Sequence, residues 1–390
     1  MIKTHVIRLY PTFKQEVLFK KSCGVARHSY NWALSKWQEL HKLGDKPSAY
    51  SLIKLQNSIK RSEMPFYMEV SKTAPQYAIH NLEKAYKSMW KLGTKYPKFK
   101  KKGVRDSFVA VENKEAYWQK DYRIHIPKVG KVKCAENLRF VGRVNSVKVK
   151  RISDKWFAII NVETSETDMS VNNENQVVIG VDAGIKSMFV TSDGSVYNNP
   201  RSLRVNLKKL RRANKSLARK KKDSNNREKA KIKLSKLHYR ISCVRSHALH
   251  CATTSIVNKA DKIVIEGLSV ANMIKNRSLS LALSDVGIAE GFRQIKYKAE
   301  WQGKEVIIAD RFFPSSKLCS MCGNKKKDLK LSERMYNCDA CGFSIDRDLN
   351  AAINLANYSP TVKTTGSQAC GDGSSVSSLT QPVDEARIKN

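Results

Sequence analysis

Two closely spaced cysteine pairs constrain the fold of this chain more than any other feature. Each pair has the pattern Cys-x-x-Cys-Gly, and fifteen residues separate them: Cys319 and Cys322, then Cys338 and Cys341. A tetrahedral Zn²⁺ ion takes four thiolates, and two tight cysteine turns at this spacing supply them. The spacing therefore predicts a structural zinc ribbon over residues 319–342, with a redox-active cysteine pair as the alternative. Because four protein ligands leave no open coordination position, zinc would fold the ribbon and take no part in hydrolysis.

The other five cysteines do not indicate a second site. The total of nine is odd and four belong to one pattern, which argues against the disulfide framework of a secreted protein. The remaining cysteines are Cys23, Cys134, Cys243, Cys251 and Cys370. None has a convincing His or Asp partner in the sequence, and those in helical or strand segments are expected in the hydrophobic core.

The net charge of the chain points to a polyanionic partner. There are 72 Lys and Arg residues against 35 Asp and Glu, a formal charge of +37. Such an excess repels itself unless nucleic acid or an anionic membrane lies nearby. No apolar run approaches the roughly 18 to 20 residues of a membrane-spanning helix, and the first residues lack the apolar core of a signal peptide. We therefore expect an intracellular nucleic-acid-binding protein with no membrane partner.

Much of the positive charge is concentrated in one passage. Between Arg204 and Arg245, 17 basic and 2 acidic residues give a net +15 over 42 positions. Apolar residues recur there at helical spacing: Leu203, Leu207, Leu210 and Leu217, then Ala230, Leu234, Leu237, Ile241, Val244 and Ala248. The pattern predicts a helix pair over residues 203–250 with one packed face and one basic face. Phosphate binding is favoured over a merely solvated face, because helices that bind only each other tend to alternate charge signs.

The first part of the chain reads as a strand, a helical segment and a small β-domain. Residues 1–10 alternate apolar and polar, and Thr12 and Gln15 have the spacing of a helix capping box. A basic stretch at 95–102, with two aromatic residues, suits phosphate contact beside base stacking, or alternatively a solvated linker. Residues 107–164 are rich in β-branched and aromatic residues, which predicts short strands.

The second part has an α/β pattern after a polar boundary at 166–176. Strands are expected at residues 177–182, 187–191, 262–265 and 305–309, with a further strand after the 192–194 turn and a short helix over 344–358. The tail, 359–390, has no aromatic residue and many Ser, Gly and Thr, so we expect it to be disordered.

Three acidic residues form a second candidate site. Asp182 and Glu266 directly follow apolar strands, although an acid in that position is more often a turn or a helix cap. In the run 346–352, Asp346 suits the N-cap, whereas Asp348 shares the packing face of the helix with Ala352. A carboxylate on a packing face is costly unless it binds a cation. Three such acids can hold two hard divalent ions, which activate water for phosphodiester hydrolysis.

The order of these motifs closely resembles the TnpB family of bacterial and archaeal insertion sequences, relatives of the compact type V CRISPR effectors. The motifs are Val181-Asp182-Ala183-Gly184-Ile185-Lys186, Arg219-Lys220-Lys221-Lys222, Ile265-Glu266-Gly267-Leu268, Ser315-Ser316-Lys317-Leu318-Cys319-Ser320-Met321-Cys322-Gly323 and Asp346-Arg347-Asp348-Leu349-Asn350-Ala351-Ala352. The resemblance extends over about residues 1–358. Ala183 stands where a larger apolar residue is common in the family and Gly267 where an acidic residue is common, but neither departure removes one of the expected metal ligands.

The resemblance implies an α/β, ribonuclease H-like (RuvC) nuclease domain whose active-site acids are Asp182, Glu266 and Asp348. The implied domains are a β-barrel-like wedge domain (1–11 and 96–165), an α-helical recognition lobe (12–95), the nuclease domain (171–318 and 343–358), the basic helix pair within it (203–250), the zinc ribbon as a target-binding insertion (319–342) and the disordered tail (359–390). The basic pair would line the duplex of guide and target.

The resemblance further implies an RNA-guided endonuclease of the prokaryotic cytosol and nucleoid. It would take a guide RNA from the transposon end and cleave double-stranded DNA next to a short transposon-associated motif. Its cofactors would be two Mg²⁺ ions, with Mn²⁺ as a substitute, and one structural Zn²⁺; a monomer is expected. The rival hypothesis is a guided or unguided DNA-binding repressor or accessory transposition protein that does not cut. A third is a metal-dependent nuclease that uses no RNA, because basic charge alone does not distinguish RNA from DNA.

Overall fold

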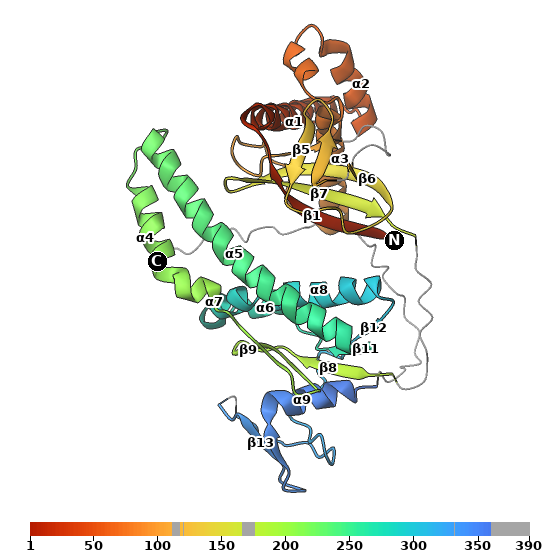
Figure 1. Cartoon of the computed structure of the whole chain (residues 1–390), viewed down its shortest axis with the longest axis vertical. Coiled ribbons are helices and arrows are strands. Elements are labelled where there is room, and N and C mark those ends of the chain that lie inside the picture. The colour runs from red at the N-terminus through yellow and green to blue at the C-terminus, as the bar shows by residue number, and fades with distance from the viewer. Residues whose placement is uncertain (111–117, 120, 166–175, 331, 360–390) are drawn as a thin grey trace.

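The computed structural model describes residues 1–110, 118–119, 121–165, 176–330 and 332–359. The predicted tail at 359–390 and the predicted boundary at 166–176 lie outside the described residues, except for their margins. Within the described ranges, the chain forms an N-terminal half and a C-terminal half, each built around its own sheet and hydrophobic core (Figure 1).

The N-terminal half packs helices against a seven-stranded antiparallel sheet with the order β2-β6-β7-β1-β5-β4-β3. Its strands are β1 (Ile2–Tyr10), β2 (Ser107–Ala110), β3 (Trp118–Gln119), β4 (Arg123–Ile126), β5 (Gly130–Cys134), β6 (Arg143–Ile152) and β7 (Lys155–Glu163). Its helices are α1 (Phe13–Lys42), α2 (Ala49–Ile59), the 3₁₀ turn η1 (Pro65–Glu69) and α3 (Thr73–Leu92). The capping box expected at Thr12 is confirmed, because its side chain accepts from the Gln15 N–H and the Gln15 side chain accepts from the Thr12 N–H.

Helices and sheet in this half share one hydrophobic core. Phe19 of α1 packs with ring centroids 5.1 Å from Trp156 of β7 and 5.7 Å from Phe108 of β2. The predicted core cysteines Cys23 and Cys134 are buried in the same core, which confirms that expectation for both.

The C-terminal half contains a five-stranded mixed sheet with the order β10-β9-β8-β11-β12. Its strands are β8 (Val178–Asp182), β9 (Ser187–Thr191), β10 (Val196–Asn198), β11 (Lys262–Ile265) and β12 (Glu305–Ile308). Strands β8, β9 and β10 form an antiparallel meander, whereas β11 pairs parallel with both β8 and β12. The carboxyl ends of β8, β11 and β12 therefore lie at the same edge of the sheet.

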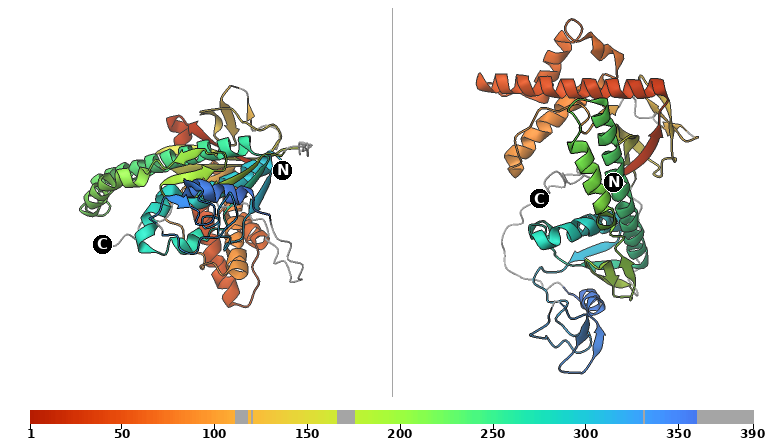
Figure 2. Two further views of the ribbon diagram at one scale, coloured as in Figure 1. Left: turned by 90° about the horizontal axis from the view of Figure 1, so that it is seen from below. Right: turned by 90° about the vertical axis from the view of Figure 1, so that its left-hand side faces the viewer.

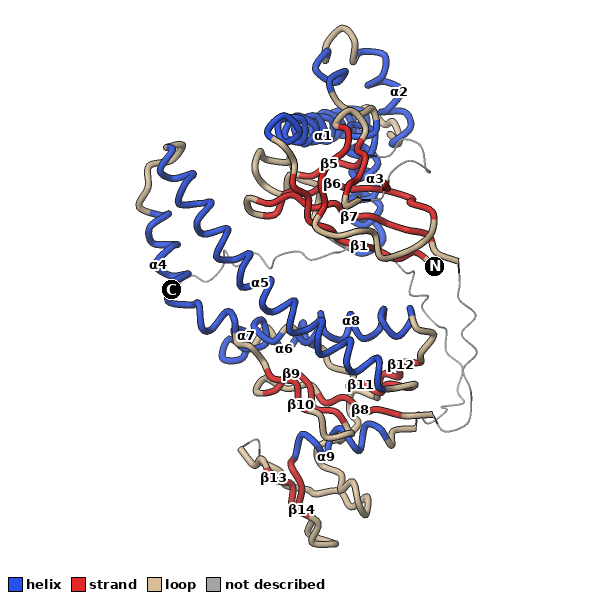
Figure 3. Tube along the Cα trace, in the orientation of Figure 1, coloured by secondary structure: helices blue, strands red, loops and turns tan. Residues whose placement is uncertain are grey.

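Helices cover both faces of this sheet (Figure 3). The helices are α4 (Ser202–Ala218), α5 (Asn225–Lys259), α6 (Val270–Met273), α7 (Arg277–Val286), α8 (Ile288–Trp301) and α9 (Arg347–Ala356). Because side chains alternate along a strand, Ile263 and Ile265 pack in the core with α5 and α8, whereas Val264 packs with Leu355 of α9 on the opposite face. The sheet is thus the middle layer of three.

Helix α9 lies in backbone contact with β8. A Cβ atom placed on Gly180 would lie 2.0 Å from the Ala352 carbonyl oxygen and 2.4 Å from the Ala356 nitrogen. Both Ala351 and Ala352 are fully buried in the same contact region. Because Gly180 and Asp182 lie on one face of β8, and Ala352 lies one helical turn after Asp348, this contact sets the separation of the two acids.

The predicted basic helix pair is α4 and α5, which extends away from the sheet toward the N-terminal half (Figure 2). Leu203, Leu210 and Ile241 are buried between the two helices. The buried Asp285 carboxylate accepts from the Leu203 and Arg204 N–H groups at 2.8 and 2.9 Å, so the end of α7 caps the start of α4.

Part of the predicted packing of α5 is wrong. Val244 was expected on the packed face, and Cys243 and Cys251 in the core, yet all three are exposed. Helix α5 is 35 residues long and extends beyond the elements that pack against it. It packs against α4 at Ile241 and against the sheet from Leu249 onward, and the residues between these two contacts are less covered. Cys370 lies outside the described residues.

The helix expected over 344–358 is shorter than predicted. Residues Ser344–Asp346 form strand β14, which pairs antiparallel with β13 (Met335–Asn337), and α9 begins only at Arg347. Cys338 and Cys341 lie in the turn between β13 and β14, so pairing of these two strands holds the second cysteine pair in place.

The Gly180 contact leads to a stability prediction. We expect Gly180→Ala to lower the thermal midpoint of the C-terminal half, because the new methyl group cannot occupy the space of the α9 backbone and a forced shift costs about 1–3 kcal/mol or more. Gly24→Ala is the matched control, since a Cβ there would meet only the Arg27 side chain at 3.9 Å and Ala favours a helix. Differential scanning calorimetry of both variants measures the effect, and equal midpoints would contradict the proposed contact.

Candidate active site and metal centre

The structure brings the three predicted acids together at one edge of the mixed sheet. Asp182 ends β8, Glu266 directly follows β11, and Asp348 lies in the first turn of α9. Asp346 is the N-cap, as predicted, and its carboxylate accepts from the Asp348 and Leu349 N–H groups at 2.9 and 3.1 Å. With Asp346 occupied by the cap, Asp348 is the acid of the pair that interacts with Asp182 and Glu266.

The electrostatics of these acids show mutual repulsion. Desolvation raises the pKa of Asp182 well above its ordinary value, and the charges of Glu266 and Asp348 raise it further. Desolvation also raises the pKa of Glu266, against hydrogen bonds from Asp182 and Ser315 that lower it. Without a cation, the raised pKa favours the protonated form of Asp182, whose side chain is hydrogen-bonded to that of Glu266.

A divalent cation would relieve this repulsion. Carboxylate oxygens are the ligands that Mg²⁺ and Mn²⁺ take, and raised carboxyl pKa values at a sheet edge are typical of functional sites. Among the described residues, the four cysteines are the one group of possible metal ligands whose ligand atoms all lie within 4.8 Å of one another. The carboxylate oxygens of the three acids are therefore farther apart than the four cysteine sulfur atoms. The residues present therefore fit cations that keep several water ligands.

Three polar residues near the acids were missed by the sequence analysis. Ser315 is buried and its hydroxyl donates to Glu266 Oε1 at 3.2 Å. Asn350 and Asn354 of α9 are buried and donate to carbonyl oxygens of the segment before the first cysteine pair. The i, i+4 spacing of the two asparagines on a helix was the available signal.

The four predicted zinc ligands converge at the tip of the C-terminal half, beside the β13–β14 hairpin. The Sγ atoms of Cys319 and Cys341 are 3.7 Å apart, and those of Cys322 and Cys338 are 3.6 Å apart. Bonds of about 2.3 Å in a tetrahedron place sulfur atoms about 3.8 Å apart, so the four thiols fit Zn²⁺.

Local backbone geometry prepares these thiols for a metal. The N–H groups of Cys341 and Ala340 lower the pKa of Cys338 to about 6, which favours the thiolate. At Cys341 the Phe343 N–H lowers the pKa, but desolvation and hydrogen bonds with the other thiols prevail and raise it to about 12. Zinc binding would therefore displace protons from the cluster.

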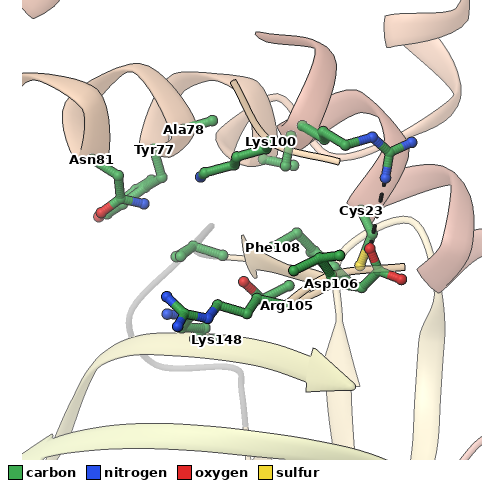
Figure 4. Close-up of a pocket in the computed structure, with 15 residues that line it drawn as sticks. Cys23, Tyr77, Ala78, Asn81, Lys100, Arg105, Asp106, Phe108 and Lys148 are labelled. Carbon is green, nitrogen blue, oxygen red and sulfur yellow. Dashed lines mark ion pairs between the residues drawn. The ribbon is translucent and has the colours of Figure 1, made fainter. Parts of the chain in front are cut away.

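A basic pocket lies in the N-terminal half, where α1 and α3 meet strands β2 and β6 (Figure 4). Tyr77 and Asn81 of α3 face it from one side, and Arg105 and Lys148 from the other. Lys100, from the predicted basic stretch, also lines it. Its one acidic lining residue, Asp106, is paired with Arg27 at 3.6 Å.

The lysines of this pocket lack neutralising partners among its lining residues. Burial, and then the charge of Lys148, lowers the pKa of Lys100; burial lowers the pKa of Lys148. Both side chains retain solvent contact, so neither lysine is fully enclosed. Excess positive charge of this kind favours an anion such as a phosphate group.

No helix among the described residues is long and apolar enough to cross a membrane.

Comparison with known protein families gives three matches along the chain. The model described as "Probable transposase" matches residues 159–277, and the one described as "Cas12f1-like, TNB domain" matches residues 290–355. A "Helix-turn-helix domain" model matches residues 1–46, where the structure has strand β1 and the single continuous helix α1.

Two curated relatives are similar over nearly the whole chain. A protein of Streptomyces pristinaespiralis named "Putative RNA-guided DNA endonuclease" is 32% identical over 376 residues, covering 94% of this chain and 90% of that protein. The Escherichia coli K12 protein "Putative RNA-guided DNA endonuclease InsQ" is 31% identical over 369 residues, covering 89% and 90%. The solved "Cas12f1-sgRNA-target DNA complex" aligns over 92% of this chain and 99% of its own, at 17% identity and with a TM-score of 0.35.

Replacement of the buried Asp182 carboxyl group by a neutral amide should stabilise the metal-free protein. We expect Asp182→Asn to raise the thermal midpoint in EDTA at pH 7 by about 2–4 °C, the shift that roughly 1 kcal/mol produces in a unit of this size, because folding raises the pKa of Asp182. When folding raises the pKa of an acid, the folded state loses stability as the pH rises above the pKa of that acid in the unfolded chain, near 3.9. The stability gained by Asp182→Asn should therefore shrink toward pH 4. Asp45→Asn, at an exposed acid of the N-terminal half, is the control. A gain that is the same at both pH values would contradict the raised pKa of Asp182.

Removal of one ribbon thiol should release the metal. We expect Cys338→Ser to reduce bound zinc from one ion per chain to a small fraction, because three thiolates bind Zn²⁺ far more weakly than four. Elemental analysis of the purified protein measures the zinc, and limited proteolysis near residues 319–342 reports the folding of the ribbon. Cys243→Ser, at an exposed thiol of α5, should retain full zinc; equal zinc contents in the two variants would refute the assignment.

Proposed function

This chain belongs to the TnpB family, and from that premise we propose that it is an RNA-guided endonuclease of an insertion sequence that cleaves double-stranded DNA by metal-ion-dependent phosphodiester hydrolysis. The observation that carries the proposal is the convergence of Asp182, Glu266 and Asp348 at one sheet edge, where burial and then the charges of the other two acids raise the pKa of Asp182. The names of both relatives agree with this activity. The layered mixed sheet, with an acid after each of two parallel strands, agrees with a ribonuclease H-like (RuvC) nuclease domain.

The catalytic roles follow from the positions of the acids. Asp182, Glu266 and Asp348 would hold two Mg²⁺ ions, or Mn²⁺, which activate the attacking water and neutralise the leaving oxygen. The chain fixes two of these carboxylates on strand ends and one on a helix packed against the same sheet. This rigid placement keeps the oxygens in position before DNA arrives, which is how preorganised sites lower a reaction barrier.

Two basic surfaces, the α4–α5 pair and the pocket around Lys100 and Lys148, would bind the nucleic acid. The α4–α5 pair, with its net +15 between Arg204 and Arg245, would follow the backbone of the guide and target duplex. The pocket around Lys100 and Lys148 would contact DNA at the adjacent motif, since Tyr77 and Asn81 add groups that can stack on or hydrogen-bond with bases. In this assignment residues 12–95 act as recognition lobe, 1–11 and 96–165 as wedge domain, and 319–342 as target-binding ribbon.

Loss of one acid should separate cutting from binding. With guide RNA, matched target and Mg²⁺ supplied, we expect Asp182→Ala to reduce cleavage by at least about 10³-fold, the order of effect of removing an essential electrostatic group, while target binding persists. Asp261→Asn is the control, since Asp261 lies at the opposite end of β11 from Glu266. Gel assays of cleavage and binding measure both quantities.

Two results would overturn the proposed function. If Asp182→Ala cuts as fast as the parent protein, the assigned acids are not the active site. If protein expressed with its native flanking DNA carries no discrete RNA, the guided mechanism fails; binding without cutting by the parent protein would favour a repressor.

A further inference from the structure

Helix α9 lies between the mixed sheet and the zinc ribbon, and its second turn contacts the segment that connects them (Figure 1). Asn354 Nδ2 donates to the carbonyl oxygens of Ser315 and Leu318 at 2.8 and 2.7 Å. Asn350 Nδ2 donates to the Leu318 oxygen at 2.6 Å, and its Oδ1 accepts from the Ser320 N–H at 3.0 Å. Two amides of one helix thus bind both ends of residues 315–320.

This segment also contacts the candidate active site. The Ser315 hydroxyl donates to Glu266 Oε1 at 3.2 Å, and Ser315 is only 6% exposed. Asn350 is fully buried and Asn354 is 7% exposed, so their hydrogen bonds form away from water. A continuous set of hydrogen bonds therefore runs from α9, which carries Asp348, through Ser315 to Glu266.

Glu266 has particular need of such support. It follows the last residue of β11, and its side chain has three rotatable bonds whose freedom must be lost before it can bind a cation. The hydrogen bond from Ser315 to Oε1 restricts the orientation of the Glu266 carboxylate. Partners that orient a ligand in this way commonly contribute 10- to 100-fold to metal affinity.

We propose that Ser315 is a positioning residue for Glu266, and that Asn354 holds Ser315 in place from the helix that carries Asp348. The inference rests on the proposed function, because it assumes that the three acids bind catalytic cations. It assigns the segment before the zinc ribbon a role in setting the active site, in addition to its role in presenting Cys319.

The test compares two variants with a matched serine. Ser315→Ala removes only the hydroxyl group that contacts Glu266, and Asn354→Leu removes the amide at similar volume. The control is Ser195→Ala. Ser195 Oγ donates to a carboxylate in the same way, to Asp193 Oδ2 at 3.0 Å, but it lies at the edge of the sheet opposite the three acids. Full-length protein freed of RNA is titrated with Mn²⁺, and free Mn²⁺ is counted by electron paramagnetic resonance.

We expect Ser315→Ala to weaken Mn²⁺ binding by about tenfold, and Asn354→Leu to weaken it by a similar factor, at unchanged zinc content. In the guided complex, the Mg²⁺ concentration for half-maximal cleavage should rise more than the rate at saturating Mg²⁺ falls. A purely structural role would lower the thermal midpoint and leave both metal titrations unchanged. If Asn354→Leu does not fold, Ser315→Ala alone decides.

The outcomes separate the two proposals. If the parent protein binds Mn²⁺ and cuts DNA, but Ser315→Ala titrates like Ser195→Ala, the positioning role is wrong and the proposed function stands. If the parent protein neither binds Mn²⁺ nor cuts, the proposed function fails and this inference fails with it.

Discussion

The backbone contact between β8 and α9 determines the geometry of the C-terminal half. Gly180 admits the carbonyl of Ala352 to a distance that no side chain at position 180 would allow, and small Ala351 beside it is also fully buried. The contact aligns Asp348 with Asp182 at a sheet edge where burial dehydrates the Asp182 and Glu266 carboxyl groups and like charges lie close together. Desolvation and charge repulsion at the site therefore destabilise the metal-free fold, and the packing of the surrounding three layers must offset that cost.

Local sequence signals predicted most of this half. An acid after an apolar strand pointed to Asp182 and Glu266, helical periodicity favoured Asp348 over Asp346, and cysteine spacing selected four thiols that the structure brings together. These features depend on neighbours in the chain or on short repeats, which a sequence displays directly. The residue types alone could not reveal that the chosen acids repel one another or how closely they approach.

Tertiary contacts account for what was missed. Ser315 and Asn354 look like ordinary loop and helix residues, and only the fold brings their partners to them. Strand β14 was predicted as helix because three residues are too few to show alternation, and pairing with β13 decides their conformation. Val244 was predicted on the packed face, yet it is exposed, because helical periodicity locates a face but does not tell how far along a helix its partner extends.

The position of α9 in the chain has a consequence for synthesis. Strand β8 is synthesised well before α9, the helix that covers its Gly180 face. Contacts between segments so distant in sequence form slowly, and domains generally fold as units once complete. A nascent or truncated chain therefore exposes an apolar sheet face and lacks its third acid. Premature termination would yield an incompetent protein, not an unregulated nuclease.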